Sequence, residues 1–88
     1  MVESRRSELE IIVKILNISK EGEKKTNILY KCNLSYSSLQ NYLPFLIKKE
    51  ILEESIVKNK SKTFKLYKTT SKGLNFLESA KKTLKLLR

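Results

Sequence analysis

Apolar residues recur at helical spacing in the middle of the chain, between residues 24 and 50. Leu39, Leu43 and Leu46 follow an i, i+4, i+7 pattern, which places all three on one face of a helix. This spacing predicts a helix over residues 36–49 whose apolar face turns towards a core.

A shorter helix and a tight turn precede this helix. The sequence predicts a helix over residues 26–32, capped by Thr26, and a turn at Asn33 and Leu34. Ser35 then caps the second helix, because its hydroxyl accepts a hydrogen bond from a free N–H of the first turn. Two helices joined by such a turn form a helix-turn-helix, whose second helix enters the major groove of DNA.

The face of the second helix opposite the leucines carries small, polar, uncharged side chains in its first turns. Asn and Gln pair with adenine, and Ser pairs with several bases. An ordinary solvated face has the same composition, so this helix alone leaves both interpretations open. The residues on or beside this face are Ser37, Ser38, Gln40, Asn41, Pro44 and Lys48.

Pro44 lies inside this predicted helix. It lacks a backbone N–H, and its ring crowds the carbonyl of Gln40. We therefore expect a kink at this point, or a break into two shorter helices.

The N-terminal segment predicts a helix that ends near Lys20. Its apolar residues form two neighbouring stripes, which is wider than the single face that a surface helix needs. We expect the C-terminal helix, from the same chain or from a partner, to cover the second stripe. The first stripe is Leu9, Ile12, Val13 and Leu16, and the second is Ile11, Ile15 and Ile18.

β-branched and aromatic residues flank a lysine-rich segment after the helices. This pattern predicts a hairpin with strands over residues 52–57 and 63–69 and a five-residue turn over residues 58–62. The pattern does not decide whether the even-numbered or the odd-numbered residues of the second strand face the core. A hairpin placed directly after a recognition helix is a wing.

Lysines lie at two places that suit phosphate contacts. Lys58, Lys60 and Lys62 lie in the predicted turn of the wing. Lys24 and Lys25 precede a helix N-terminus, which favours an anion. A lysine-rich loop alone is usually just solvated, but next to a helix-turn-helix the DNA interpretation is favoured.

The last segment predicts an amphipathic helix from Ser71 to about Leu87, capped by Thr70. Its apolar residues follow a narrow seam with alternating steps of three and four, which is typical of paired helices. We expect dimerisation through this helix; packing on the first helix and binding to a membrane surface are the alternatives. The seam residues, with one that widens the seam, are Leu74, Leu77, Ala80, Leu84 and Leu87.

The chain has 88 residues, which is enough for one small domain, and a formal net charge of +10. Residues 55–88 hold ten Lys and Arg against one acidic residue, whereas residues 1–54 are nearly neutral. A basic half of this kind predicts a polyanionic partner, either nucleic acid or an anionic membrane surface. No apolar run approaches the roughly 18 residues of a membrane span.

The sequence contains few residues that could act in catalysis or bind a metal. There is no histidine, and Cys32 is the single cysteine, so neither a His/Cys metal cluster nor a histidine-based triad can form. Gly22 and Gly73 are the only glycines, which excludes a glycine-rich phosphate loop. We expect no enzyme activity, cofactor or metal. Cys32 is interpreted as a small buried apolar residue in a reducing compartment.

The same stretches resemble a known family. RSELEIIVKIL (6–16), KTNILYKCNLSY (25–36), EIL (50–52) and TSKG (70–73) are similar to the small basic winged-helix proteins of the Sulfolobus ten-kilodalton "a" class. This resemblance implies a homodimer joined by antiparallel C-terminal helices, which binds double-stranded DNA in a regulatory or nucleoid-structuring role. It also implies recognition-helix positions at Ser35, Tyr36, Ser37, Ser38, Gln40 and Asn41. Pro44 and Thr69 depart from the family pattern.

The sequence therefore predicts an α+β, mostly helical winged helix-turn-helix over residues 1–69 and a dimerisation helix over residues 70–88. We expect a transcriptional regulator that binds double-stranded DNA at the nucleoid in the cytoplasm, without a small-molecule ligand. The alternatives are an architectural chromatin protein and an assembly module that docks an acidic protein. The candidate DNA-binding residues are Lys24, Lys25, Thr26, Ser35, Tyr36, Ser37, Ser38, Gln40, Asn41, Lys48, Lys58, Lys60 and Lys62.

Overall fold

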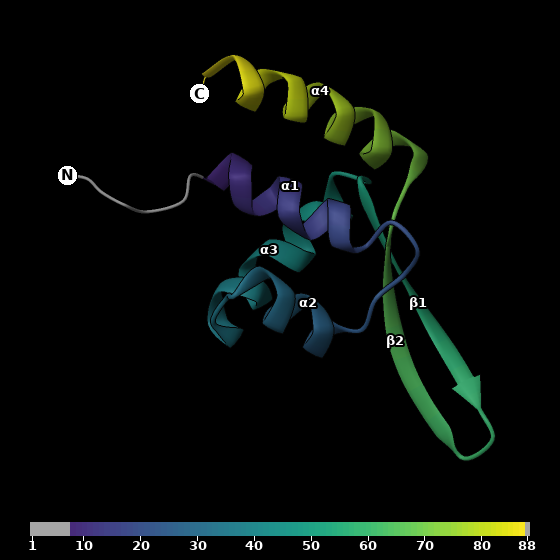
Figure 1. Cartoon of the computed structure of the whole chain (residues 1–88). Coiled ribbons are helices and arrows are strands. Elements are labelled where there is room, and N and C mark those ends of the chain that lie inside the picture. The colour runs from purple at the N-terminus through teal and green to yellow at the C-terminus, as the bar shows by residue number, and fades with distance from the viewer. Residues whose placement is uncertain (1–7, 88) are drawn as a thin grey trace.

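The computed structural model describes residues 8–87. Its elements are, in chain order, α1 (Glu8–Ile18), α2 (Lys25–Cys32), α3 (Tyr36–Lys48), β1 (Leu52–Asn59), β2 (Lys62–Thr69) and α4 (Ser71–Leu87). The first three helices pack together, the hairpin projects away from them, and α4 lies along α1 (Figure 1). The predicted order of three helices, a hairpin wing and a C-terminal helix is therefore confirmed.

The core lies between the helices and the base of the hairpin. Leu39, Leu43 and Leu46 are buried, so the predicted apolar face of α3 is confirmed. Burial of each such side chain stabilises the fold by about 1.5–3 kcal/mol. The buried cluster consists of Ile15, Leu16, Ile28, Cys32, Leu39, Leu43, Leu46, Ile51, Leu52, Tyr67 and Leu77.

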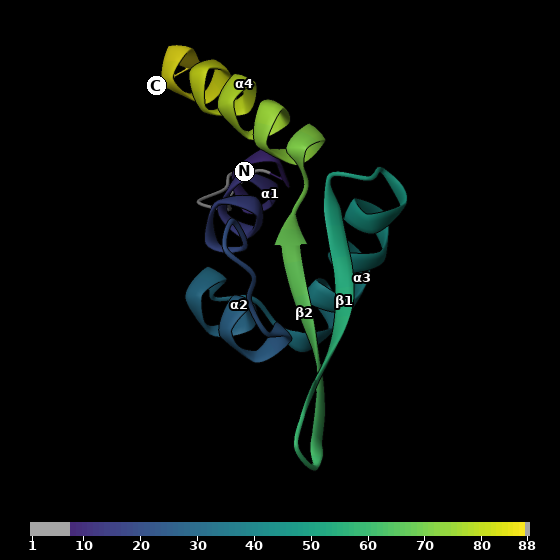
Figure 2. The same ribbon diagram turned by 90° about the vertical axis from the view of Figure 1, so that its right-hand side faces the viewer.

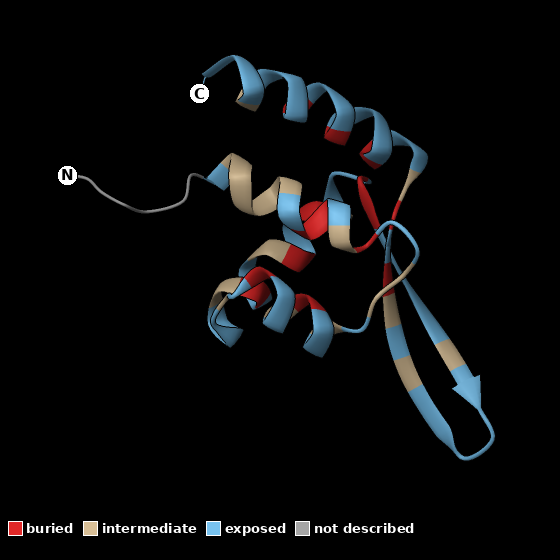
Figure 3. Cartoon of the chain, viewed as in Figure 1, coloured by how far each residue is buried: buried red, intermediate tan, exposed pale blue. Residues whose placement is uncertain are grey.

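The C-terminal helix covers α1 within the same chain. Figures 1 and 2 show α4 lying beside α1, and the buried positions of α4 face α1 in Figure 3. Leu77 and Ala80 are the buried apolar side chains of α4. This packing explains why α1 carries a second apolar stripe. No helix of the described residues is long and apolar enough to cross a membrane.

The turn between α2 and α3 is fixed by local hydrogen bonds. Asn33 takes the left-handed conformation with φ of 54°, and the N–H groups of Asn33 and Leu34 donate to carbonyls of α2 at 3.2 and 3.1 Å. Such a left-handed residue is a common helix terminator. Ser35 caps α3 as predicted, since its Oγ accepts the N–H of Ser38 at 3.1 Å.

The start of α2 differs from the prediction. The helix begins at Lys25, so Thr26 lies inside it and does not cap it. The backbone of Glu23 pairs with Tyr67 of β2 through two N–H···O bonds of 2.9 and 2.8 Å. This long-range pairing fixes the chain immediately before Lys24, which occupies the N-cap position without a side-chain cap.

The hairpin is tighter than the sequence pattern suggests. Asn59 pairs with Lys62, so only Lys60 and Ser61 form the turn, and the prediction of a five-residue turn is wrong. The residues at both ends of the predicted turn instead extend the ladder of backbone pairs. Lys60 has a φ of 56°, the positive value that the first central residue of a tight hairpin turn adopts.

Both faces of β2 are partly covered. Tyr67 and Thr69 are buried towards the core, whereas Phe64 and Leu66 are half-buried on the other face. Lys24, from the loop between α1 and α2, lies over the Phe64 ring with Nζ 4.4 Å from the centroid. Because this loop covers the second face of the strand, β2 carries apolar residues on both faces. The sequence of β2 therefore does not alternate simply between apolar and polar residues.

Pro44 does not break the recognition helix. α3 continues through Pro44 to Lys48, so the expected break into two helices is wrong, while the kink stays a prediction. Leu43 and Leu46 are buried on either side of the proline. Their burial holds both halves of the helix against one core and offsets the single backbone hydrogen bond that Pro removes.

Thr70 caps α4 as predicted. Its Oγ1 accepts the N–H of Gly73 at 3.0 Å and donates to the carbonyl of Glu50 at 2.7 Å. The helix start is thereby joined to the chain segment between α3 and β1. Gly73 is buried there, close to the backbone of Ile51.

Candidate nucleic-acid interface

The outward face of α3 is polar and accessible. Ser37, Asn41, Pro44 and Lys48 are all exposed, which agrees with their predicted position opposite the leucines. Their helical spacing keeps them in one row along the helix. This row presents an amide and a hydroxyl early in the helix and an ammonium group near its end.

Two serines of the predicted interface are engaged in capping. Ser35 Oγ accepts the N–H of Ser38 and also donates to Ser38 Oγ at 3.0 Å. Ser38 is half-buried, whereas Ser37 is exposed. Ser37 Oγ also lies 3.4 Å from Ser35 Oγ, but its exposure makes it the serine of this turn most accessible to an external partner.

Lys25 is held against the flank of α3. Its Nζ donates to Gln40 Oε1 at 2.7 Å and lies 5.4 Å from the centroid of the Tyr36 ring. Tyr36 and Gln40 are four residues apart, so they present neighbouring side chains on one helix face. The structure thus joins three predicted DNA-binding residues into one cluster across the helix-turn-helix.

A hollow separates α3 from the wing. Its volume is about 510 Å³, and lysines from three elements line it: Lys25 of α2, Lys48 of α3 and Lys65 of β2. Gln40 and Pro44 line the same hollow. Lys65 also pairs with Glu54 across the hairpin at 3.8 Å. Glu54 lines the hollow as well and offsets part of the charge of Lys65, so most of the positive charge beside the recognition helix comes from Lys25 and Lys48.

The wing carries its charge at the far end. Lys58, Lys60 and Lys62 are all exposed, and the hairpin extends well beyond the helices (Figure 1). Although Lys58 and Lys62 belong to strands, they remain near the turn and flank Lys60. Exposed ammonium groups of this kind suit phosphates, which carry no base information.

Charge is partly neutralised beside α2. Lys31 pairs with Glu23 at 2.9 Å, and Asn27 donates to the same carboxylate at 2.9 Å. These hydrogen bonds, Asn27 first, hold the pKa of the Glu23 carboxyl below its usual value. The carboxylate stays charged, so Lys31 adds little to the basic surface. Lys24 and the exposed Thr26 remain at the start of the helix.

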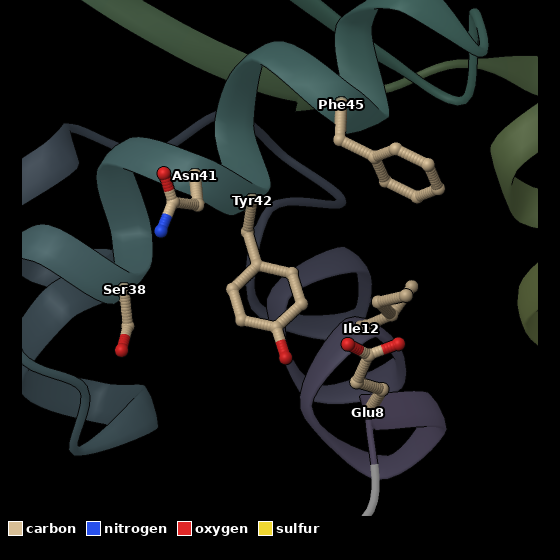
Figure 4. Close-up of a pocket in the computed structure, with 6 residues that line it drawn as sticks. All are labelled: Glu8, Ile12, Ser38, Asn41, Tyr42 and Phe45. Carbon is tan, nitrogen blue, oxygen red and sulfur yellow. The ribbon is translucent and has the colours of Figure 1, made fainter.

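A second hollow lies between α1 and α3. It has a volume of about 420 Å³, and Tyr42 and Phe45 reach from α3 towards Ile12 and Glu8 of α1 (Figure 4). Phe45 is 47% exposed, and sequence reasoning did not single it out. It lies seven residues after Ser38, so helical spacing would have placed it beside the polar face.

The predicted dimerisation residues divide into two groups. Leu77 and Ala80 are buried within the chain, and Leu84 is half-buried. Leu74 and Leu87 are exposed, and so is Leu86, at 86%. α4 therefore leaves apolar surface accessible near its start, at Leu74 and Phe76, and to a greater extent in its last turn, at Leu86 and Leu87.

Within residues 8–87, no group of three or more His, Cys, Asp or Glu side chains is placed to hold a metal ion. A helix-turn-helix followed directly by a β-hairpin is the arrangement of a winged helix. The chain belongs to the winged helix-turn-helix family, whose model matches residues 5–88.

In sequence, the chain is similar to protein MJ0287 of Methanocaldococcus jannaschii, with 42% identity over 59 residues. The match covers 66% of this chain and 57% of that protein, so the chain spans little more than half of that relative's length.

Two solved structures share the fold. Sso10a-2, a DNA-binding protein from Sulfolobus solfataricus, has a TM-score of 0.78 and 26% identity over 92% of this chain and 81% of its own. A PadR-like transcription factor from Bacteroides fragilis has a TM-score of 0.72 and 25% identity over 90% and 82%. The first similarity confirms the resemblance to the Sulfolobus ten-kilodalton class.

Proposed function

We propose that this chain binds double-stranded DNA and regulates transcription, acting at the nucleoid in the cytoplasm. The observation that carries the proposal is the hollow beside α3, which Lys25, Lys48 and Lys65 line together with Gln40 of the recognition helix. In this mechanism α3 enters the major groove, and lysines of α2 and the wing neutralise phosphates on either side.

The solved relatives support this proposal. Sso10a-2 is a DNA-binding protein, and the protein from Bacteroides fragilis is a transcription factor. Both share the fold over at least 90% of this chain. The same fold therefore serves DNA binding in one relative and transcription control in another.

An architectural role in chromatin is the second candidate. It is favoured by the strong basic surplus of residues 55–88, which binds any sequence equally well. The uncharged outward side chains of Ser37 and Asn41 favour the regulator, because they suit base edges better than phosphates. Regulation by base readout is therefore our first choice.

We further propose that the protein acts as a homodimer through α4. Leu86 and Leu87 are exposed at the end of this helix, and they offer an apolar contact for a second copy. Dimers of helix-turn-helix proteins bind two half-sites on one face of the duplex, about one helical turn apart. A homodimer would thereby double the phosphate contacts of one protomer.

The DNA proposal is tested by fluorescence-anisotropy titration of a labelled random-sequence duplex at three salt concentrations. Neutralising about six phosphates gives a log–log salt slope of about −5. The titration is repeated with a pool of short duplexes: a sequence bound about a thousandfold more tightly than the rest supports a regulator. Absence of a preferred duplex supports the architectural role, and no binding at low salt overturns the DNA proposal.

Asn41→Ala tests base readout by the outward face of α3. Asn41 is exposed in the middle of that face, so its loss should weaken binding to the preferred duplex by about 1–3 kcal/mol. Binding to random duplex should change little. Lys48→Ala, on the same face, is the control and should weaken both duplexes alike. An equal effect of Asn41→Ala on every duplex would rule out base readout at this position.

A further inference from the structure

Lys25 and Gln40 form a hydrogen bond in which only Lys25 can be the donor. Lys25 Nζ lies 2.7 Å from Gln40 Oε1. An ammonium group donates and cannot accept, so the amide oxygen must face the lysine and the amide nitrogen must face away. The Tyr36 ring, 5.4 Å from the same Nζ, provides a second favourable contact that keeps the lysine in place.

This contact changes what Gln40 offers to an external partner. A glutamine amide alone presents both an acceptor and a donor, and for this reason it pairs with adenine. Lys25 takes up one of the two lone pairs of Oε1 and its ammonium lies beside that oxygen, so the NH₂ group is the part of Gln40 that lies away from the lysine. The other N–H bonds of the Lys25 ammonium point away from Oε1. The pair as a whole therefore presents donors.

The base pairs differ in how they meet a surface made only of donors. In the major groove, guanine presents two neighbouring acceptors, N7 and O6. Adenine presents one acceptor, N7, beside the N6 amino donor, which would be left facing another donor. Cytosine presents a donor, and thymine presents a single acceptor, O4, beside its apolar methyl group. Guanine is therefore the base that matches the Lys25–Gln40 pair.

We propose that Lys25 sets the base preference of Gln40, so that the pair reads guanine and not the adenine that glutamine alone would read. This inference rests on the proposed DNA-binding function and makes Lys25 a specificity-determining residue as well as a basic one. Gln40 is exposed on the recognition helix, next to Asn41, and lines the hollow that faces the wing. It is accessible to a base edge from that side.

The experiment compares the sequences that the wild type and its variants select from a randomised duplex pool. The wild type should prefer guanine over adenine at one position by about tenfold. Lys25→Met removes the donor and frees Oε1, so the preference at that position should move to adenine. Gln40→Ala leaves the Lys25 donors but removes the NH₂ group, so it should weaken the guanine preference at the same position without moving it to adenine. Lys25→Arg, which keeps a donor at this place, should retain guanine.

Lys24→Met is the matched control. Lys24 is the neighbouring residue and carries the same charge, but its ammonium lies over Phe64, away from Gln40. Its loss should weaken binding to all duplexes while guanine remains preferred. Charge loss and altered base preference are separated by this comparison.

The outcomes separate the inference from the function on which it rests. If the wild type and Lys25→Met select the same sequence, the inference is overturned, whereas the proposal of a sequence-specific regulator still stands. Selection of adenine by the wild type overturns it too, because Gln40 then reads the base that glutamine reads without Lys25. Duplex binding without any selected sequence overturns the inference and the regulator together, whereas absence of duplex binding rejects the DNA-binding function.

Discussion

Gly73 occupies a position where any larger residue would overlap the backbone. A Cβ at this position would overlap the carbonyl oxygen of Ile51 and lie 2.7 Å from Thr69 Cγ2. Backbone atoms cannot move aside as a flexible side chain can. The first turn of α4 can therefore approach the segment before β1 only because this residue has no side chain.

Gly73→Ala should lower the free energy of unfolding by about 1–3 kcal/mol, the usual cost of overpacking. Urea denaturation with far-UV circular dichroism measures the change. Asn75→Ala, at an exposed position of the same helix, is the control and should stay within about 0.5 kcal/mol of the wild type. Equal stability of the two variants would show that the segment before β1 shifts at little cost.

The ionisation of the Tyr67 hydroxyl makes the stability of the protein depend on pH in the alkaline range. Burial raises the pKa of its hydroxyl to about 12, with further contributions from its hydrogen bond to Glu54 and from the Glu54 charge. The unfolded tyrosine ionises near pH 10, and the folded one does not until about pH 12. The stabilisation is therefore complete below pH 10 and is lost as pH rises towards 12.

Between pH 9 and 11, this titration should lower the free energy of unfolding by about 1 kcal/mol. Tyr67→Phe lacks the titrating hydroxyl, so the gap in stability between the two proteins should narrow over this interval. Urea denaturation of both proteins at each pH measures the gap, and contributions that they share cancel. A gap that stays constant from pH 9 to 11 would contradict the assigned cause.

Among the elements, the wing is defined by its turn. Lys60 and Ser61 form the two-residue turn at the tip. Lys60 has a positive φ, a conformation that a lysine adopts at some cost in strain. The wing can therefore lose the charge at its tip without losing its shape, provided that the replacement tolerates this conformation.

Lys60→Gly should keep or slightly raise the stability of the protein, because glycine adopts positive φ freely. DNA affinity should fall by the same factor for every duplex, and the magnitude of the log–log salt slope should fall by about 1. Anisotropy titrations at several salt concentrations measure both effects. Ser61→Ala, beside it in the turn, is the control that leaves the charge intact. A loss confined to one duplex would instead assign base readout to the wing.

At the scale of the whole molecule, α4 is buried along its middle and exposed at its end. Leu77 and Ala80, near the middle of the helix, are buried within the protomer, and Leu86 and Leu87 are exposed at its end. The predicted dimerisation seam is thus partly used inside the chain. A second copy would meet the last turn of the helix more than its beginning.

Replacing both Leu86 and Leu87 by Gln should convert a homodimer into a monomer, as measured by analytical ultracentrifugation. The unfolding free energy of the protomer should change little, because these side chains are 86% and 76% exposed. Lys85→Gln, at an exposed position of the same turn, should leave the dimer intact. A wild type that sediments as a monomer at all concentrations would reject the dimer proposal.

The sequence by itself determined the local features of this protein. The apolar row of Leu39, Leu43 and Leu46 predicted the buried face of α3, and Ser35 and Thr70 were correctly identified as helix caps. These features depend on residues within a few positions of one another, where periodicity and hydrogen-bonding capacity are enough. The uneven distribution of charge was equally visible from composition.

Only the tertiary structure decided the contacts between distant residues. Glu23 pairs with Tyr67 just before α2, which begins one residue earlier than predicted. The hydrogen bond from Lys25 to Gln40 joins two helices through residues that are 15 positions apart in the sequence. The packing of α4 on α1 divided a seam that looked uniform in the sequence. Such contacts depend on which surfaces meet in the folded chain, and no short window of residues contains that information.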